Sequence, residues 1–126
     1  MKTITPYMSA CGYIRSTASG LRLRVSLLEQ SRRINAFSAG GKHILTRTVI
    51  EAHGVDDQPE LARLLDLATS PEHPFDQLIV SAAKHLSSEP RRIRELKDRL
   101  SRADVRLIIL EAVPTLVRPP MMAEVL

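Results

Sequence analysis

Short apolar runs alternate with longer segments of helical spacing along this chain. Residues 43–51 are rich in β-branched side chains, which favour strands, and residues 78–80 form a continuous apolar run typical of a strand buried on both faces. Pro59 and Pro90 each precede apolar residues at helical spacing and suit the first turn of a helix. The pattern predicts strands at residues 10–15, 43–51, 76–81 and 105–110, and helices at 21–39, from 59 and from 90.

This alternation of strands and helices predicts the fold class. It favours a single three-layer α/β domain, with a mainly parallel central sheet and helices on both faces. Gly40-Gly41 is expected to end the first helix. The apolar stripes expected to be buried are Leu61, Leu64, Leu65 and Ala68 in the second helix, and Ile93, Leu96 and Leu100 in the third.

Composition narrows the class of protein. The chain has 126 residues, 44% of them hydrophobic, which suits one globular domain. It shows neither an apolar stretch of about 18 residues nor a secretory signal pattern, so we expect a soluble cytoplasmic protein without a membrane partner. The single cysteine, Cys11, is expected in the core of the first strand. No Cys/His cluster has zinc-ligand spacing and the four histidines are dispersed, so no metal or other cofactor is predicted.

Charge is distributed unevenly along the chain. The formal net charge is +4. Residues 84–106 hold eight Lys/Arg against four acids, whereas residues 51–76 hold one Arg against seven acids. We expect the first segment to attract phosphate and the second to repel it.

The motif Tyr13-Ile14-Arg15-Ser16-Thr17 ends the first predicted strand, and further short motifs follow it in order. They are Ser-Leu-Leu-Glu-Gln at residues 26–30 and the segments 57–65, 75–80, 84–88 and 105–109. Together these segments resemble the N-terminal catalytic domain of serine recombinases of the resolvase and invertase family. The first motif is similar to the family's Tyr-x-Arg-x-Ser, whose serine attacks a DNA phosphate. The resemblance covers residues 10–111 and implies a resolvase-like fold that acts on DNA.

The resemblance also implies altered chemistry at the catalytic positions. It places Gln58 at one family arginine, His85 and Ser88 at two others, and Lys84 at an aspartate. Family members transfer a phosphoryl group from DNA to serine, and their arginines stabilise the charge that builds on the phosphate oxygens. At about 3 kcal/mol per donor, three lost arginines remove roughly 6 to 9 kcal/mol, or a factor of about 10^4 to 10^6 in rate. The resemblance therefore predicts retained architecture with degenerate chemistry.

The candidate nucleophile is Thr17, at the position of the family's serine, beside the retained Arg15. The extra methyl group of threonine crowds and stiffens the nucleophile. Ser16 offers an unbranched hydroxyl, but on a regular strand its side chain points to the other face. Ser16 could therefore serve only where the backbone is locally irregular. In the catalytic alternative Thr17 attacks phosphate, Arg15 and Lys84 stabilise it, and His85 assists proton transfer. The arginine losses favour instead a structural or vestigial hydroxyl.

Two interpretations of the basic surface stay open. Arginines near the altered site and in the third helix are candidate contacts for DNA phosphates, or they form solvated faces paired with acids such as Glu95 and Asp98. Gln30 either faces the site or is an amide with no catalytic duty. The candidate phosphate-binding residues are Arg22, Arg24, Arg32, Arg33, Arg91 and Arg92.

Three functional hypotheses follow. The leading one is a catalytically degenerate serine-recombinase-like domain that acts as an interaction or oligomerisation module, with DNA, another copy or another recombinase-like protein as partner. The second is a divergent recombinase that forms a phospho-hydroxyl DNA intermediate, and the third is a non-catalytic DNA-binding regulator. We expect residues 1–9 to be an N-terminal extension, 112–126 to be a proline-containing tail, and no separate DNA-binding domain to be present.

Overall fold

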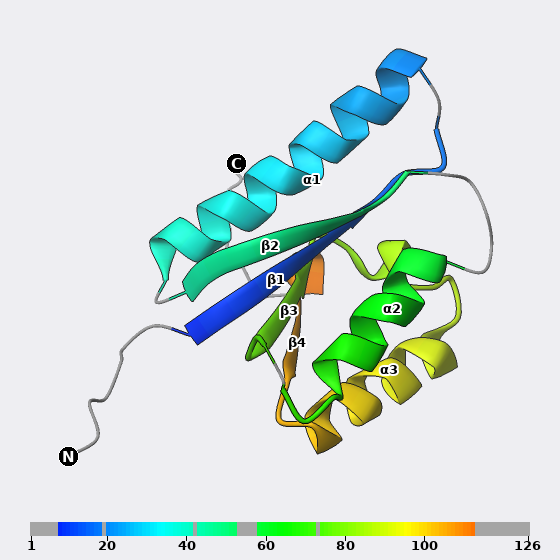
Figure 1. The fold of residues 1–126 in the computed structure, drawn as a ribbon. Helices are drawn as coiled ribbons and strands as arrows, with labels where there is room; N and C mark the ends of the chain where they lie inside the picture. The colour runs from blue at the N-terminus through cyan, green and yellow to red at the C-terminus, as the bar shows by residue number, and fades with distance from the viewer. Residues whose placement is uncertain (1–7, 19, 42, 53–57, 73, 113–126) are drawn as a thin grey trace, which may run out of the picture.

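The computed structural model describes residues 8–18, 20–41, 43–52, 58–72 and 74–112 (Figure 1). Predictions made for the first seven residues and for residues 113–126 lie outside this part of the chain. The elements are β1 (Met8–Arg15), α1 (Gly20–Gly40), β2 (His43–Glu51), α2 (Pro59–Ala68), β3 (Gln77–Val80), the 3-10 helix η1 (Ala83–His85), α3 (Pro90–Arg102), β4 (Arg106–Ile109) and the 3-10 helix η2 (Leu110–Ala112).

The strands form one parallel sheet in the order β2-β1-β3-β4. In the centre of this sheet, Tyr13 of β1 is paired with Val49 of β2 on one side and with Val80 of β3 on the other. The register between β1 and β2 shifts after Ala10, where the hydroxyl of Thr46 donates a hydrogen bond of 3.1 Å to the Ala10 carbonyl oxygen. The Ala10 carbonyl thus accepts a side-chain hydrogen bond at the point where the strand ladder is irregular.

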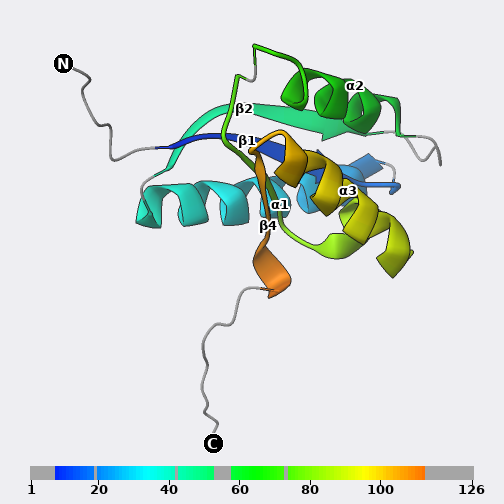
Figure 2. The same ribbon diagram turned by 90° about the horizontal axis from the view of Figure 1, so that it is seen from below.

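Helices cover both faces of the sheet, so the predicted three-layer α/β class is confirmed (Figures 1 and 2). α1 lies on one face, and α2 and α3 lie on the other. Cys11 and Tyr13 belong to the core under α2 and α3, whereas Ala10 and Ile14 belong to the smaller core under α1. The alternation along β1 therefore serves two hydrophobic cores at once.

Gly12 allows α1 to approach the sheet closely. A Cβ atom at this position would lie 3.3 Å from Cγ2 of Ile34 and 3.4 Å from the hydroxyl of Thr48. Ile34 is 1% exposed, so it has little room to move away. The absent side chain thus sets the distance between the α1 layer and the strands.

The predicted elements agree with the structure to within a few residues. The predicted strand at residues 43–51 is β2, and the predicted helix starts at Pro59 and Pro90 are the first residues of α2 and α3. β1 begins two residues earlier than predicted. The two 3-10 helices were not predicted. None of the described helices is long and apolar enough to cross a membrane.

Candidate anion-binding site at the carboxyl edge of the sheet

The candidate site lies at the carboxyl ends of β1 and β3. After β1 the chain continues into α1 on one face, and after β3 it continues through η1 into α3 on the other face. Neighbouring parallel strands whose connections leave to opposite faces open a crevice between their carboxyl ends, which is the usual ligand position in such sheets. The motif residues that follow these two strands are thereby brought together.

Gln30 of α1 holds the backbone at the end of β1. Its carbonyl oxygen accepts a 2.9 Å hydrogen bond from the Arg15 amide, and its amide nitrogen donates to the Arg15 carbonyl at 2.7 Å and to the Ser26 hydroxyl at 3.1 Å. Gln30 is 4% exposed. Gln30 also lines one of the hollows described below, so it faces the site, while its polar atoms are engaged by the protein itself.

The two candidate hydroxyls lie in different surroundings. Ser16 follows the last residue of β1, is buried, and accepts a hydrogen bond of 3.2 Å from the Ala18 amide through its side-chain oxygen. Its own amide donates to the Glu51 carbonyl at 3.2 Å. Thr17 is exposed and lines a surface hollow. Thr17 is therefore the more accessible hydroxyl, and Ser16 takes part in a local turn.

A buried polar network lies behind the site. The Tyr13 hydroxyl donates a 2.9 Å hydrogen bond to Glu51, and Gln58 donates to that hydroxyl at 3.0 Å and to the His85 carbonyl at 3.1 Å. Burial and the bond to Glu51 raise the pKa of Tyr13, while the bond from Gln58 opposes this change, so the hydroxyl stays protonated as a donor. The network connects β1, β2 and η1.

Glu51 also caps α2. Its carboxylate accepts hydrogen bonds of 3.0 Å from the amides of Glu60 and Leu61 in the first turn. The residue before the helix, Gln58, makes no side-chain cap and has a left-handed backbone with φ of 47°. A buried carboxylate at a helix N-terminus satisfies free amides and interacts favourably with the helix dipole. Gln58 thus serves as a buried cross-link, and its amide is used within the fold.

Two adjoining hollows make up the accessible part of the site. One has a volume of about 400 Å³ and the other about 470 Å³. The first is lined by Arg15, Ser16, Thr17, Ala18, Arg22, Ser26, Lys84 and His85. The second shares Ser26, Lys84 and His85 and adds Glu29, Gln30, Arg32, Arg33, Ser81, Ala82 and Glu111.

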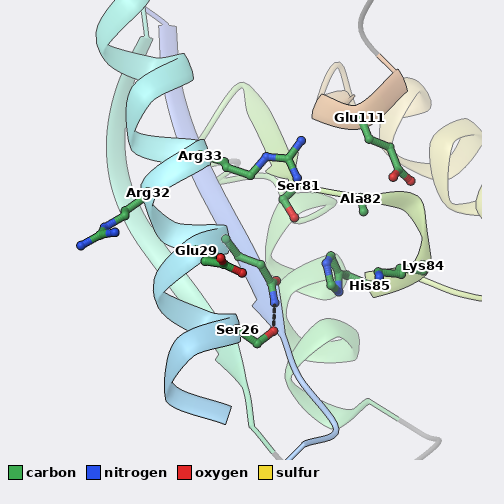
Figure 3. A pocket seen from close by; sticks show the side chains of 10 residues that line it. Ser26, Glu29, Arg32, Arg33, Ser81, Ala82, Lys84, His85 and Glu111 are labelled. Carbon is green, nitrogen blue, oxygen red and sulfur yellow. Dashed lines mark hydrogen bonds between the residues drawn. The ribbon is translucent and has the colours of Figure 1, made fainter. Parts of the chain in front are cut away.

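Figure 3 shows the second hollow. Arg33 extends from α1 towards Ser81, whereas the guanidinium of Arg32 points away from the hollow. Lys84 and His85 come from η1, and Glu111 comes from η2. Glu111 accepts a 3.2 Å hydrogen bond from the Ala83 amide. Glu29 of α1 lines the same hollow, so two acidic side chains lie among the cations and offset part of their charge.

The surroundings of His85 favour its neutral form, because burial and neighbouring positive charges both act against its protonation. Burial lowers the pKa of His85, and the positive charges of Lys84, Arg15 and Arg33 lower it further, while Glu111 raises it. At neutral pH the imidazole is therefore uncharged, and the lysine and arginines carry the positive charge of the hollow. Cations of this kind are chemically able to attract an anion and to donate hydrogen bonds to it.

The structure brings together some of the predicted site residues and separates others. Arg15, Thr17, Lys84 and His85 surround one hollow, and Arg22 lines the same hollow. A third hollow of about 330 Å³ joins Arg15 to Arg92 at the start of α3, with Gln58, Ser87, Ser88 and Glu89. Arg24 and Arg91 are exposed and line none of these three hollows.

Sequence reasoning missed the roles of two acids, Glu51 and Glu111. Each follows or ends a predicted strand, so a signal was present in their position at the carboxyl edge of the sheet. Their partners, however, are backbone amides of α2 and η1 and, for Glu51, also the Tyr13 hydroxyl. Among the residues that the structure describes, no group of three or more His, Cys, Asp or Glu side chains is arranged to hold a metal ion.

Solved structures with a similar fold are serine-recombinase catalytic domains. A resolvase family site-specific recombinase from Streptococcus pneumoniae aligns with a TM-score of 0.72 and 16% identity, over 82% of this chain and 72% of that chain. The N-terminal catalytic domain of TP901-1 integrase aligns with a TM-score of 0.71 and 20% identity, over 82% and 78% of the two chains. The C-terminal catalytic domain of ISC1926 TnpA, an IS607-like serine recombinase, gives 0.69 and 15%, over 82% and 67%.

No protein-family model matches the sequence, and neither does any curated protein. At these identities the likeness concerns the fold. The chain has the fold of a serine-recombinase catalytic domain, and the resemblance stated from its motifs is confirmed at that level.

Proposed function

We propose that this domain is a catalytically degenerate serine-recombinase-like module that serves in interaction or oligomerisation and associates with the phosphate backbone of DNA. The observation that carries the proposal is the use of Gln58 within the fold. At a position where the family resemblance has an arginine, this chain has a buried neutral amide bound to Tyr13 and to the backbone of η1. A transition-state cation is thereby replaced by a structural cross-link.

The remaining chemistry of the site supports binding more than catalysis. Lys84 provides a point charge where the resemblance has an aspartate, and a neutral His85 takes the place of a guanidinium. Neither supplies the planar, bidentate donor that stabilises a transferring phosphoryl group. Arg15, Arg22 and Lys84 nevertheless line one accessible hollow, and this arrangement favours a bound phosphate of the DNA backbone.

The first test is binding to a labelled DNA duplex, followed by fluorescence anisotropy over a salt series. Lys84→Gln is expected to weaken binding and to reduce the slope of log affinity against log salt by about 1. Arg63→Gln is the matched control, because this substitution also removes one positive charge. Arg63 is an exposed cation on α2 that pairs with Glu60. Wild-type binding no stronger than that of a charge-matched unrelated protein removes DNA from the proposal and leaves protein partners.

The second test asks whether the domain has lost the ability to form a covalent intermediate with DNA. A pool of nicked duplexes with randomised sequence is incubated with the protein, and covalent protein-DNA adducts are trapped with detergent. We expect no adduct with the wild-type chain, and therefore no difference between it and Thr17→Ala or Ser16→Ala. An adduct that disappears in either variant, while circular dichroism shows the fold preserved, overturns the degenerate assignment.

One observation favours the catalytic alternative, a divergent recombinase. Thr17 is exposed in the same hollow as Arg15, Lys84 and His85, so a phosphate bound there lies beside a hydroxyl and an uncharged imidazole. A neutral imidazole is able to accept the proton of an attacking hydroxyl. The adduct experiment decides between this alternative and the proposed function. The third hypothesis, a DNA-binding regulator without chemistry, predicts strongly salt-dependent binding with little sequence preference.

A further inference from the structure

The outward face of α1 carries apolar side chains that the fold does not use. The helix packs on the sheet through the face that contains Gln30, Ile34 and Ser38, which are its buried residues. On the outward face, Leu21, Val25 and Leu28 are 75%, 47% and 52% exposed. A helix at the surface of a globular protein normally has polar residues on this side. α1 is thus apolar on two faces, and one of them is unpartnered among the described residues.

The spacing of these exposed positions follows a heptad. Starting at Leu21, steps of four and three residues alternate along the whole helix, and every position so reached is exposed. This spacing is that of the a and d positions of a coiled coil, with Leu at d and β-branched Val at a in the first half. The outward seam consists of Leu21, Val25, Leu28, Arg32, Asn35 and Ala39.

We propose that α1 pairs in parallel with α1 of a second copy of this chain through the outward seam. The charges beside the seam are self-complementary. Arg24 precedes Val25 at a g position, and Glu29 follows Leu28 at an e position; both are exposed. In a parallel pair, a g residue faces the e residue of the following heptad on the other helix. Arg24 of each copy therefore meets Glu29 of the other, and the pair repeats on both sides of the two-fold axis.

The composition of the seam indicates that the pairing is weak enough to be reversible. Its first half is apolar, and a β-branched residue at a with leucine at d favours two parallel helices. Its second half contains Arg32 and Asn35, and polar residues at seam positions lower stability while setting the register. The dimer is therefore reversible and forms with increasing concentration. This inference rests on the interaction role in the proposed function and names its surface and its partner.

The test is sedimentation equilibrium of the full chain over about three decades of concentration, up to about 1 mM. We expect a monomer-dimer equilibrium, and Leu28→Arg is expected to raise the dissociation constant on the order of 100-fold. Ile44→Arg is the matched control, because Ile44 on the edge strand β2 is also 52% exposed. Loss of the dimer with Ile44→Arg but not with Leu28→Arg overturns the α1 pairing in favour of the sheet edge.

Two further variants test the parallel register. Arg24→Glu and Glu29→Arg are each expected to weaken the dimer at low salt, and the double variant is expected to restore it. With Leu21→Cys, a parallel pair places the two introduced thiols together, so mild oxidation yields a disulfide-linked dimer; the native Cys11 is buried and does not contribute. Absence of both charge rescue and cross-linking in a dimeric protein overturns the proposed register.

The outcomes separate this inference from the proposed function. A chain that is monomeric at every concentration overturns the α1 pairing, while salt-dependent DNA binding in the anisotropy experiment leaves the DNA-associated role standing. Conversely, a dimer that depends on Leu28 in a protein that does not bind DNA supports the pairing and removes DNA from the proposed function.

Discussion

Glu51→Gln changes a buried carboxylate into an amide of the same shape. Glu51 is 3% exposed, and its carboxylate accepts three hydrogen bonds, one from the Tyr13 hydroxyl and two from the amides of Glu60 and Leu61. A glutamine has one acceptor oxygen, so its amide nitrogen must face at least one of these donors. The substitution thus removes a charged acceptor at the start of α2 and places two donors against each other.

The expected loss of unfolding free energy in Glu51→Gln follows from these contacts. Loss of one hydrogen bond to a charged group costs about 1.5 to 3 kcal/mol, and loss of the charge at the helix N-terminus adds about 0.3 to 1 kcal/mol. We therefore expect the free energy of unfolding to fall by about 2 to 4 kcal/mol. For a domain of this size, that change lowers the melting temperature by about 8 to 16 °C.

Urea denaturation monitored by circular dichroism measures the change, and Glu60→Gln is the control. Glu60 pairs with Arg63 at the surface, with 40% and 74% of the two side chains exposed, and such pairs contribute at most about 1 kcal/mol. If Glu51→Gln and Glu60→Gln destabilise the protein equally, the carboxylate of Glu51 does not cap α2.

Three further predictions concern the core and the site. Gly12→Ala is expected to destabilise the protein by about 1 to 3 kcal/mol in urea denaturation, because its methyl group would crowd Ile34 and Thr48 at 3.3 and 3.4 Å; unchanged or increased stability contradicts the close approach of α1. Burial, helped by neighbouring cations, lowers the pKa of His85 from 6.5, so the unfolded chain takes up this proton at a higher pH than the folded chain. The stability linked to His85 is therefore present above about pH 6.5 and declines as the pH falls below it. The change in unfolding free energy between pH 7.5 and pH 5.5 should thus be smaller for His85→Asn than for the wild type. An equal change in the two proteins refutes the lowered pKa of His85. Burial raises the pKa of the Cys11 thiol to about 12, so a thiol-specific chromogenic reagent should react only when urea unfolds the chain, and rapid reaction in the native state contradicts this placement.

The elements of the fold were predictable because their signals are local. The β-branched run of β2 lies between Gly40-Gly41 and a polar stretch of sequence, so both of its ends are marked in the sequence. The start of β1 was less predictable because it depends on pairing. Ser9 donates through its amide and its hydroxyl to the Asp76 carboxylate, at 3.2 Å in each case, and Asp76 lies far away in the sequence. The two 3-10 helices are too short to show periodicity.

The candidate site was predictable as a set of positions but not as a set of contacts. The motifs drew attention to Arg15, Thr17, Lys84 and His85, which line one hollow. The burial of Gln58 between Tyr13 and η1 was not predictable, since nothing in the neighbouring polar sequence indicates which distant group an amide will bind.

Periodicity and turn residues in the sequence were thus enough to define a parallel α/β domain, because hydrophobic spacing and backbone preferences act over a few neighbouring residues. Tertiary structure alone decided the partners of the polar side chains. The carboxylate of Glu51 accepts hydrogen bonds from the first turn of α2, and Gln30 is hydrogen-bonded to the backbone of Arg15. The strand register and the helix positions bring these groups within hydrogen-bonding distance. It also decided that the seam of α1 faces outward, since a helix with two apolar faces packs only one of them on the sheet.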